Sequence, residues 1–295
     1  MKYVLLGSLG KITKPLATQL IKAGHQVTIV SSGAGKAAAI EALGAGAAIG
    51  TIEDTAFLAG AFKDTDAIYT MIPPKFDAKP WKQWIGGIGR KYAEAIKVAG
   101  VKKVVNLSSI GADQVDGVGP VSGIHLAEEA LNSLSGVDIR HLRAGFFYTN
   151  FYTAIRMIKQ AGIYGNNYGP DALVPMVHPR DIAAAAAKEL LSLGFKGSSV
   201  RYVVGDERTS REITAVLGTS IGKPDLAYVP FGDEDNRKGI LGAGLSEEVA
   251  DNYTEMGVAV RTGLIIADYK KHRPQLSTTK LEDFAKEFAA AYATA

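Results

Sequence analysis

The opening stretch, Tyr3-Val4-Leu5-Leu6-Gly7-Ser8-Leu9-Gly10-Lys11-Ile12-Thr13, decides the fold of this chain. A short apolar run, typical of a buried strand, leads directly into a glycine-rich turn and then into a helical pattern. Such a turn lets backbone N–H groups approach the phosphates of a dinucleotide, and the helix N-terminus adds partial positive charge. Gly7 would permit the tight turn, and Gly10 the close approach of a ligand to the backbone. The stretch therefore predicts a pyrophosphate site.

The spacing of this motif departs from the usual fingerprint. It is G-x-x-G-x-x-T rather than G-x-G-x-x-G, and Thr13 stands where a third glycine would ease helix–strand packing. A βα turn that binds nothing is the alternative interpretation. The location favours a cofactor, because the first strand of a doubly wound sheet is where such a site belongs.

Strands and helices alternate through the first half of the chain. Patterns typical of strands at 26–30, 47–49, 67–72, 104–107 and 138–143 are separated by helical patterns, which indicates right-handed crossovers and a parallel sheet. After residue 150 helices dominate. We predict an α/β fold, a Rossmann-type doubly wound parallel sheet. Residues 1–150 would form the NAD(P)-binding core, and residues 151–295 a smaller, mostly helical lobe on the substrate side, with some elements returning to the core.

The loop after the second strand bears on the choice of cofactor. NAD-binding folds usually place an acidic residue about 20 positions after the glycines, where it binds the ribose 2′-hydroxyl. Here that place is Ser31 or Ser32, and no carboxylate lies nearby. Two hydroxyls and the ammonium of Lys36 suit a 2′-phosphate instead. We therefore expect NADP(H) to be preferred, with NAD(H) as the second possibility.

Composition excludes several classes of protein. The chain has no cysteine, which excludes disulfide frameworks, cysteine nucleophiles and thiolate metal sites. A net charge of +3 is too mild to indicate nucleic-acid binding. No apolar stretch reaches the roughly 18 residues of a membrane span, and no signal peptide is evident. We expect a cytoplasmic protein with a small-molecule substrate and without a metal.

Four segments, in order and at fitting intervals, resemble the NmrA-like proteins, which are atypical short-chain dehydrogenases. They are Tyr3–Thr13, Ser108–Ala112, His125–Leu131 and Leu142–Phe147. Within that group the chain is most similar to the bacterial NAD(P)H:quinone oxidoreductase-like branch. The resemblance is strong over residues 1–150 and weaker afterwards.

The resemblance implies NADP(H) along the strand ends. Thr51 and Ile52 would border the adenine, although Thr51 departs from the aspartate common there. The ribose and nicotinamide would be lined by Met71, Ile72 and Pro73, and the nicotinamide itself by Phe146 and Phe147. The remaining cofactor contacts expected are Gly7, Leu9, Gly10, Lys11, Ile12, Ser31, Ser32, Lys36, Ser108 and His125.

The superfamily's Tyr-x-x-x-Lys is missing, so the resemblance by itself does not imply catalysis. By helix register His125 occupies the lysine place and Val121 the tyrosine place. His125 would donate a proton, bind the nicotinamide ribose or serve only the structure. Ser109, with Ser108 beside it, would either orient the substrate or cap the loop. Tyr148, Tyr152 and Tyr164 would either stack on a flat acceptor or pack the lobe.

Two functions from different classes follow. The first is an NADPH-dependent reductase that transfers a hydride to a quinone or a related carbonyl or enone compound. The alternative is a non-catalytic NADP(H)-binding redox sensor that acts through a protein partner, as some proteins of the resembled family do. A homodimer is also possible.

Overall fold

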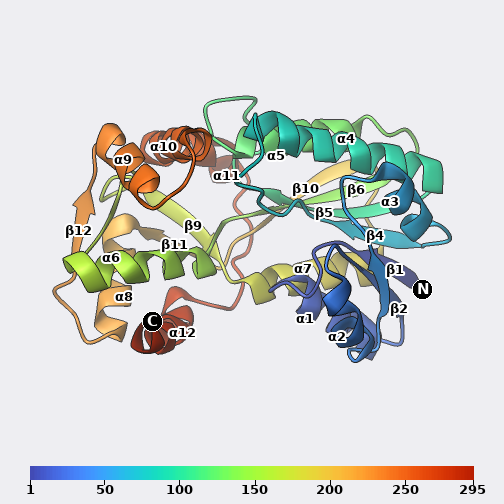
Figure 1. Ribbon diagram of the computed structural model, residues 1–295, viewed down its shortest axis with the longest axis horizontal. Coiled ribbons are helices and arrows are strands. Elements are labelled where there is room, and N and C mark those ends of the chain that lie inside the picture. Colours follow the sequence, from blue (N-terminus) through green and yellow to red (C-terminus); the bar gives the residue numbers. More distant parts are fainter. The chain divides into compact units, whose positions relative to one another are not determined.

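A seven-stranded parallel sheet combines six strands from residues 2–144 with one, β10, from residues 198–203 (Figure 1). Its strand order is β10-β6-β5-β4-β1-β2-β3. The strands are β1 (Lys2–Leu5), β2 (Gln26–Ser31), β3 (Gly46–Ile49), β4 (Ala67–Thr70), β5 (Lys103–Ser109), β6 (Asp138–Ala144) and β10 (Ser198–Val203). From β1 the order continues through β2 to β3, and from β4 it continues in the opposite direction through β5 and β6 to β10. The carboxyl ends of β1 and β4 therefore flank the switch point at which such sheets bind ligands.

Helices cover both faces of this sheet. In Figure 1, α3 (Thr55–Phe62), α4 (Trp81–Ala99) and α5 (Val121–Asn132) lie above it, and α1 (Thr13–Lys22), α2 (Ala37–Glu41) and α7 (Pro179–Ser192) lie below. The upper core buries Leu58 and Phe62 of α3 with Tyr92 and Ile96 of α4 against Val104 of β5. Both faces being covered explains why β4 is buried at every position.

The computed structural model describes residues 1–295 as two units. Unit 1 contains Met1–Ser109, Gly123–Arg143 and Ile182–Arg201, and unit 2 contains Ile110–Ser122, Ala144–Asp181 and Tyr202–Ala295. The division of the chain at residue 150 stays a prediction. None of the helices combines the length and the apolar character that crossing a membrane requires.

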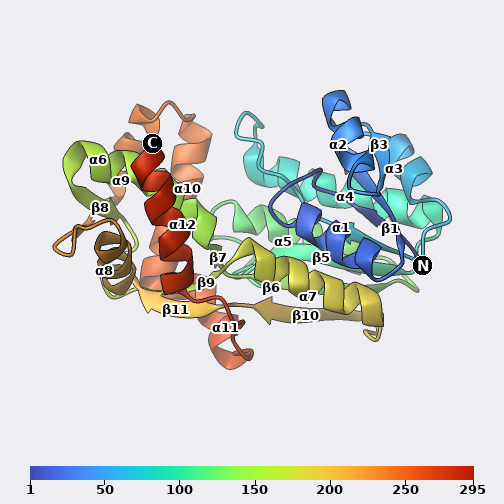
Figure 2. The same cartoon turned by 90° about the horizontal axis from the view of Figure 1, so that it is seen from below.

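Unit 2 is built from helices and two small sheets, of order β11-β9-β7 and β12-β8 (Figure 2). Its strands are β7 (Phe146–Phe147), β8 (Ile163–Asn166), β9 (Leu173–Val177), β11 (Asp206–Thr209) and β12 (Ala227–Pro230). Its α-helices are α6 (Ala154–Ala161), α8 (Ser210–Ser220), α9 (Asp233–Gly242), α10 (Glu247–Thr262), α11 (Ala267–Lys271) and α12 (Leu281–Thr294). Two 3₁₀ helices, η2 (Tyr148–Thr153) and η3 (Leu264–Ile266), complete it, and a third, η1 (Ala34–Lys36), precedes α2 in unit 1.

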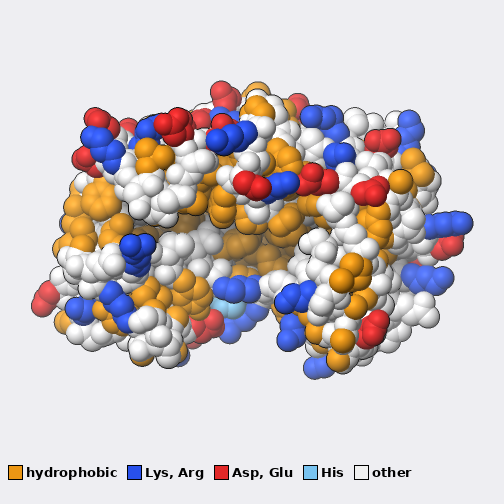
Figure 3. Space-filling model, in the orientation of Figure 1, with side chains coloured by type: hydrophobic (Ala, Val, Ile, Leu, Met, Phe, Trp, Pro, Cys, Tyr) orange, Lys and Arg blue, Asp and Glu red, His pale blue; other side chains and the backbone are white.

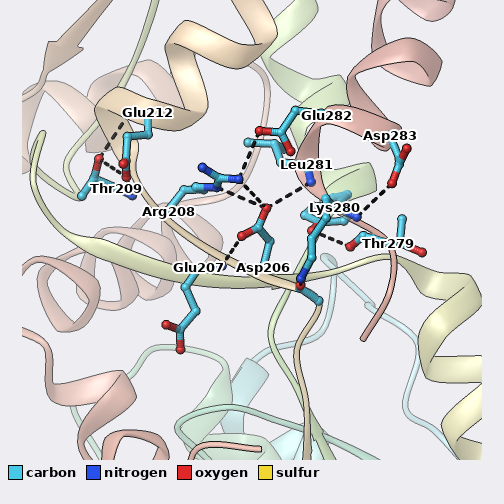
Figure 4. Close-up of polar contacts among 12 residues, drawn as sticks. Asp206, Glu207, Arg208, Thr209, Glu212, Thr279, Lys280, Leu281, Glu282 and Asp283 are labelled. Carbon is cyan, nitrogen blue, oxygen red and sulfur yellow. Dashed lines mark hydrogen bonds and ion pairs between the residues drawn. The ribbon is translucent and has the colours of Figure 1, made fainter. Parts of the chain in front are cut away.

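The start of α12 is fastened to β11 by polar contacts (Figure 4). The buried Asp206 carboxylate accepts from Arg208 Nε at 3.2 Å and from the backbone N–H of Leu281 at 3.3 Å. Arg208 Nη2 reaches Glu282 Oε1 at 3.1 Å, and Lys280 Nζ donates to the Gly205 carbonyl at 2.6 Å. These contacts hold α12 in place on unit 2.

The predicted fold class is confirmed, with differences at the ends of elements. Strand β4 ends at Thr70, whereas the apolar run predicted Ile72. The sequence predicts a helix from about Trp84, and α4 begins earlier, at Trp81. The polar, glycine-rich stretch 113–120, whose composition predicts a mobile surface loop, is partly packed: Val118 is fully buried, and a methyl group built on Gly119 would lie 2.1 Å from the Asn252 carbonyl oxygen.

Candidate functional site

The turn after β1 is locked by Gly7 and Thr13 together. Gly7 has φ +105°, a conformation that other residues rarely adopt. The Thr13 hydroxyl donates to the Leu6 carbonyl at 2.8 Å, which ties the helix start to the strand end. A methyl group built on Gly7 would lie 2.5 Å from Thr13 Oγ1. The unusual threonine of the motif therefore fills the space that a side chain at position 7 would need.

Helix α1 begins with uncapped backbone donors. Its N-cap is Ile12, whose side chain cannot accept a hydrogen bond, and no acidic residue stands in the first turn. The N–H groups of Ile12 and Thr13 make no hydrogen bond in the chain, whereas that of Lys14 reaches the Gly10 carbonyl at 3.1 Å. Gly10 and Lys11 are exposed, and Leu9 is half-buried. Free donors on a positive helix end fit a pyrophosphate.

The end of β2 differs from the sequence-based expectation in one residue. Ser31 is buried, and its hydroxyl lies 2.9 Å from the Ser8 hydroxyl and 3.3 Å from the N–H of Gly33. Ser8 itself has φ +54°. The Ser31 side chain therefore braces the phosphate turn. Ser32 and Lys36 are exposed and remain the candidates for a 2′-phosphate.

The residues after β3 and β4 lie at the same edge of the sheet, because parallel strands end on one side. Thr51 is exposed and accepts from the N–H of Glu53 at 3.2 Å, while Ile52 is half-buried against the upper core. Met71 is half-buried, like Ile72 and Pro73, and its side chain comes within 3.2 Å of the position of a Gly7 methyl group. The ends of β1, β2 and β4 thus meet, which is the predicted place for the cofactor.

The two serines at the end of β5 have different surroundings. Ser108 is buried and donates a short hydrogen bond to Glu128 of α5. Ser109 is the last residue of β5 and is half-buried. Consecutive strand residues face opposite sides of a sheet, so Ser108 braces α5, and only Ser109 keeps its predicted role toward a substrate.

His125 lies in α5, one turn before Glu128. Its side chain is 15 % exposed, and Nε2 lies 3.5 Å from Glu129 Oε1. Val121, at the place of the superfamily's tyrosine, is buried. A proton-donating or ribose-binding role for His125 stays a prediction.

Sequence reasoning missed a buried polar network behind this edge of the sheet. Arg143 of β6 donates two hydrogen bonds to the Glu128 carboxylate, from Nε to Oε1 at 3.1 Å and from Nη2 to Oε2 at 2.7 Å. The Asn106 amide donates to His141 Nδ1 at 3.1 Å, and His141 Nε2 donates to Asn132 at 2.9 Å. Because one ring nitrogen accepts and the other donates, His141 is neutral, and burial lowers its pKa. The available signal was three basic residues within the strand predicted at 138–143, namely Arg140, His141 and Arg143.

Phe146 and Phe147 form β7 in unit 2 and are half-buried. Their predicted contact with the nicotinamide stays a prediction. Tyr148 and Tyr152 pack against α12: Tyr148 stacks on Phe284 at 5.5 Å and Tyr152 on Phe288 at 6.4 Å between ring centroids. The packing interpretation therefore holds for these two tyrosines.

Electrostatics add no second class of ligand. No group of three or more histidine and acidic side chains is arranged to hold a metal ion. On the face drawn in Figure 3, basic and acidic side chains alternate over the surface without a large patch of one sign.

A glycine-rich turn, an uncapped helix and a switch point between β1 and β4 together define a dinucleotide-binding Rossmann protein. The chain belongs to the NAD(P)H-binding family, whose pattern matches residues 7–191. The predicted cofactor class is confirmed by this membership, and the resemblance to NmrA-like atypical short-chain dehydrogenases agrees with it.

One curated relative and two solved structures are similar to this chain. A (4-alkanoyl-5-oxo-2,5-dihydrofuran-3-yl)methyl phosphate reductase of Streptomyces griseus is 28% identical over 216 residues, 72% of each chain. The NADPH-dependent quinone oxidoreductase QOR2 of Escherichia coli, solved with NADPH, has a TM-score of 0.83 at 22% identity, covering 97% of this chain and 99% of its own. The triphenylmethane reductase of Citrobacter sp., solved with NADP(H), has a TM-score of 0.80 at 21% identity over 97% and 99%.

Proposed function

We propose that this protein is an NADPH-dependent reductase of quinones or related carbonyl and enone compounds. The observation that carries the proposal is the phosphate turn: uncapped donors at α1, with Gly7, Ser8 and Ser31 bracing the backbone around them. The names of the relatives support the reaction class, since all three are reductases or oxidoreductases.

The preference for NADPH over NADH is supported by the end of β2. No carboxylate stands there to bind a 2′-hydroxyl or to repel a 2′-phosphate. With the Ser31 hydroxyl occupied, Ser32 and Lys36 would supply the contacts to the phosphate. Two of the structural neighbours are described with NADPH or NADP(H) bound.

The proposed reaction requires the residues of this chain mainly to orient the acceptor against the nicotinamide. A bound nicotinamide supplies the hydride. The residues of this chain would hold the acceptor, exclude water and stabilise negative charge on the acceptor oxygen. Ser109 would orient that oxygen, and His125 would hold the ribose or donate a proton.

The test is oxidation of NADPH, followed by nicotinamide absorbance, with a panel of quinones and enones. We expect turnover with at least one quinone, and a lower kcat/KM with NADH. Variant His125→Ala should lower kcat/KM by about 10²-fold if the imidazole is a general acid. A change confined to cofactor affinity would indicate ribose binding instead.

The loss of Tyr-x-x-x-Lys favours a second candidate, an NADP(H) sensor that acts through a protein partner. Val121 at the tyrosine place is buried and apolar, so it offers no proton. Tight NADPH binding without oxidation by any quinone or enone would support the sensor and overturn the reductase.

A further inference from the structure

Unit 2 contains four tyrosines that gather around one amide. Tyr164 belongs to β8, Tyr168 to the loop after it, Tyr228 to β12 and Tyr253 to α10. The Asn166 side chain organises three of them. Its Oδ1 accepts from the Tyr228 hydroxyl and from the Tyr168 N–H, both at 2.8 Å, and its Nδ2 lies 3.5 Å from the Tyr164 hydroxyl.

An aromatic surface continues from this tyrosine cluster to β7. The Tyr168 ring meets Phe146 edge to face at 6.5 Å, and Phe146 lies 5.0 Å from Phe151. Phe151 in turn meets the Tyr164 ring at 6.4 Å. Phe146 follows the carboxyl end of β6 after a single residue, Gly145, and ligands of doubly wound sheets bind beyond such strand ends.

Tyr168 differs from its neighbours in what its hydroxyl does. The Tyr228 hydroxyl is held by Asn166, and that of Tyr164 lies beside the same amide. The Tyr168 hydroxyl makes no hydrogen bond in the chain, although its residue is only half-exposed. The hydroxyl is open to solvent rather than buried, so it is available to a ligand.

The protonation state of this hydroxyl suits a donor. Burial raises the pKa of Tyr168, and the neighbouring Tyr253 and Tyr228 raise it further. The phenol therefore stays neutral at every physiological pH and offers its proton. An acceptor with a flat aromatic ring and a carbonyl oxygen would use both features: the rings for stacking and the hydroxyl for its oxygen.

We propose that the tyrosine cluster with Phe146, supported from behind by the buried Phe151, is the acceptor subsite, and that the Tyr168 hydroxyl donates a hydrogen bond to a carbonyl oxygen of a planar quinone. The inference rests on the proposed function for the identity of the acceptor. It adds the specificity-determining residue, because a flat hydrocarbon without the oxygen would gain only the stacking.

Binding to the NADP⁺ complex tests the subsite without turnover. The probes are 1,4-naphthoquinone and naphthalene, which share the ring system and differ in the two oxygens. A chain without cysteine suits these probes, because quinones add readily to thiols. Calorimetry should show tighter binding of the quinone to wild type. In Tyr168→Phe the quinone should bind about tenfold more weakly, while naphthalene and NADP⁺ bind as before.

Two controls separate recognition from structure. Tyr292→Phe removes a hydroxyl from α12, away from the cluster, and should leave both affinities unchanged. Tyr168→Phe should keep the melting temperature of wild type, since the lost hydroxyl has no partner in the chain. Tyr228→Phe, which removes the bond to Asn166, should lower the melting temperature.

The outcomes are distinct. Equal quinone affinity in wild type and Tyr168→Phe, or no preference of wild type for naphthoquinone over naphthalene, overturns the subsite. Tyr168-dependent quinone binding without NADPH oxidation supports the subsite and refutes only the reductase.

Discussion

At the scale of the residue, we predict that Lys36 decides the choice between the two dinucleotides. It is an exposed cation in the 3₁₀ turn after β2, four residues after Ser32, and no acidic residue competes for it there. Lys36→Ala should weaken NADP(H) binding by about tenfold, the scale of a charge-assisted contact, and leave NAD(H) unaffected. Calorimetric titration of both cofactors measures this. Lys22→Ala, which removes an exposed lysine at the other end of α1, is the matched control; an equal loss for both cofactors would contradict the assignment.

Gly10 tests the position of the pyrophosphate. The residue is exposed at the start of α1, and a methyl group built on it would stand 3.0 Å from the Gly7 carbonyl oxygen. Gly10→Val adds a branched side chain where backbone and phosphate should meet, so cofactor affinity should fall below detection while circular dichroism stays native. Gly60→Val, at an exposed glycine of α3 with open space around it, controls for the substitution itself. Undiminished NADPH affinity in Gly10→Val would place the phosphates elsewhere.

At the scale of elements, Glu128 joins α5 to β5 and β6. Its buried carboxylate accepts from Ser108 and from two nitrogens of Arg143. Glu128→Gln leaves a buried guanidinium without its counter-charge, so the free energy of unfolding should fall by about 3–5 kcal/mol. Urea denaturation measures it. Glu129→Gln on the same helix, whose side chain is 62 % exposed, should change the free energy of unfolding by less than about 1 kcal/mol.

A double replacement separates the lost charge pair from lost packing. If the loss in Glu128→Gln comes from the stranded arginine, Glu128→Leu combined with Arg143→Met should recover part of the stability. No recovery would assign the loss to packing.

His141 gives the same network a pH dependence. Its pKa is lowered from the ordinary value of 6.5, mainly by burial, while Glu128 opposes and Arg143 adds to the shift. Below pH 6.5 the unfolded chain binds a proton at His141 that the folded chain does not bind. The free energy of unfolding is therefore highest above pH 6.5 and decreases as the pH falls toward the lowered pKa. The slope for one proton is at most about 1.4 kcal/mol per pH unit.

The measurement is urea denaturation of wild type and His141→Gln between neutral and mildly acidic pH. Wild type should lose stability below pH 6.5 more steeply than the variant, which has no group that titrates at this place. Parallel curves would show that other groups dominate the acid loss.

The sequence patterns predicted helices and strands better than they predicted contacts between side chains. The Asp54 N-cap of α3 follows from local rules, and its carboxylate does accept from the Phe57 N–H at 3.0 Å. The bracing role of Ser31 could not be predicted, because it depends on the left-handed Ser8 in another loop. The prediction of a mobile loop around Gly119 was wrong. A glycine indicates either a flexible loop or a close approach of two backbone segments, and only the tertiary structure distinguishes these cases. The two-residue β7 is too short for any periodicity.

At the scale of the whole molecule, the path of the chain links the two units. Three segments of unit 1 alternate with three of unit 2, so the chain passes between the units five times. Two strands are divided: β6 passes from one unit to the other at Arg143 and Ala144, and β10 at Arg201 and Tyr202. Each unit therefore contains part of β6 and part of β10.

This connectivity predicts a single cooperative thermal transition, even though the predicted cofactor contacts from Gly7 to Pro73 all lie in unit 1. NADP⁺ at 100 times its dissociation constant should stabilise the folded state by about 2.7 kcal/mol and move that one transition upward as a whole. Calorimetry shows whether the melting curve contains a single transition. Near-ultraviolet circular dichroism, which reports the aromatic cluster of unit 2 separately from the sheet, should give the same midpoint. A second transition that NADP⁺ leaves in place would show that the units unfold independently.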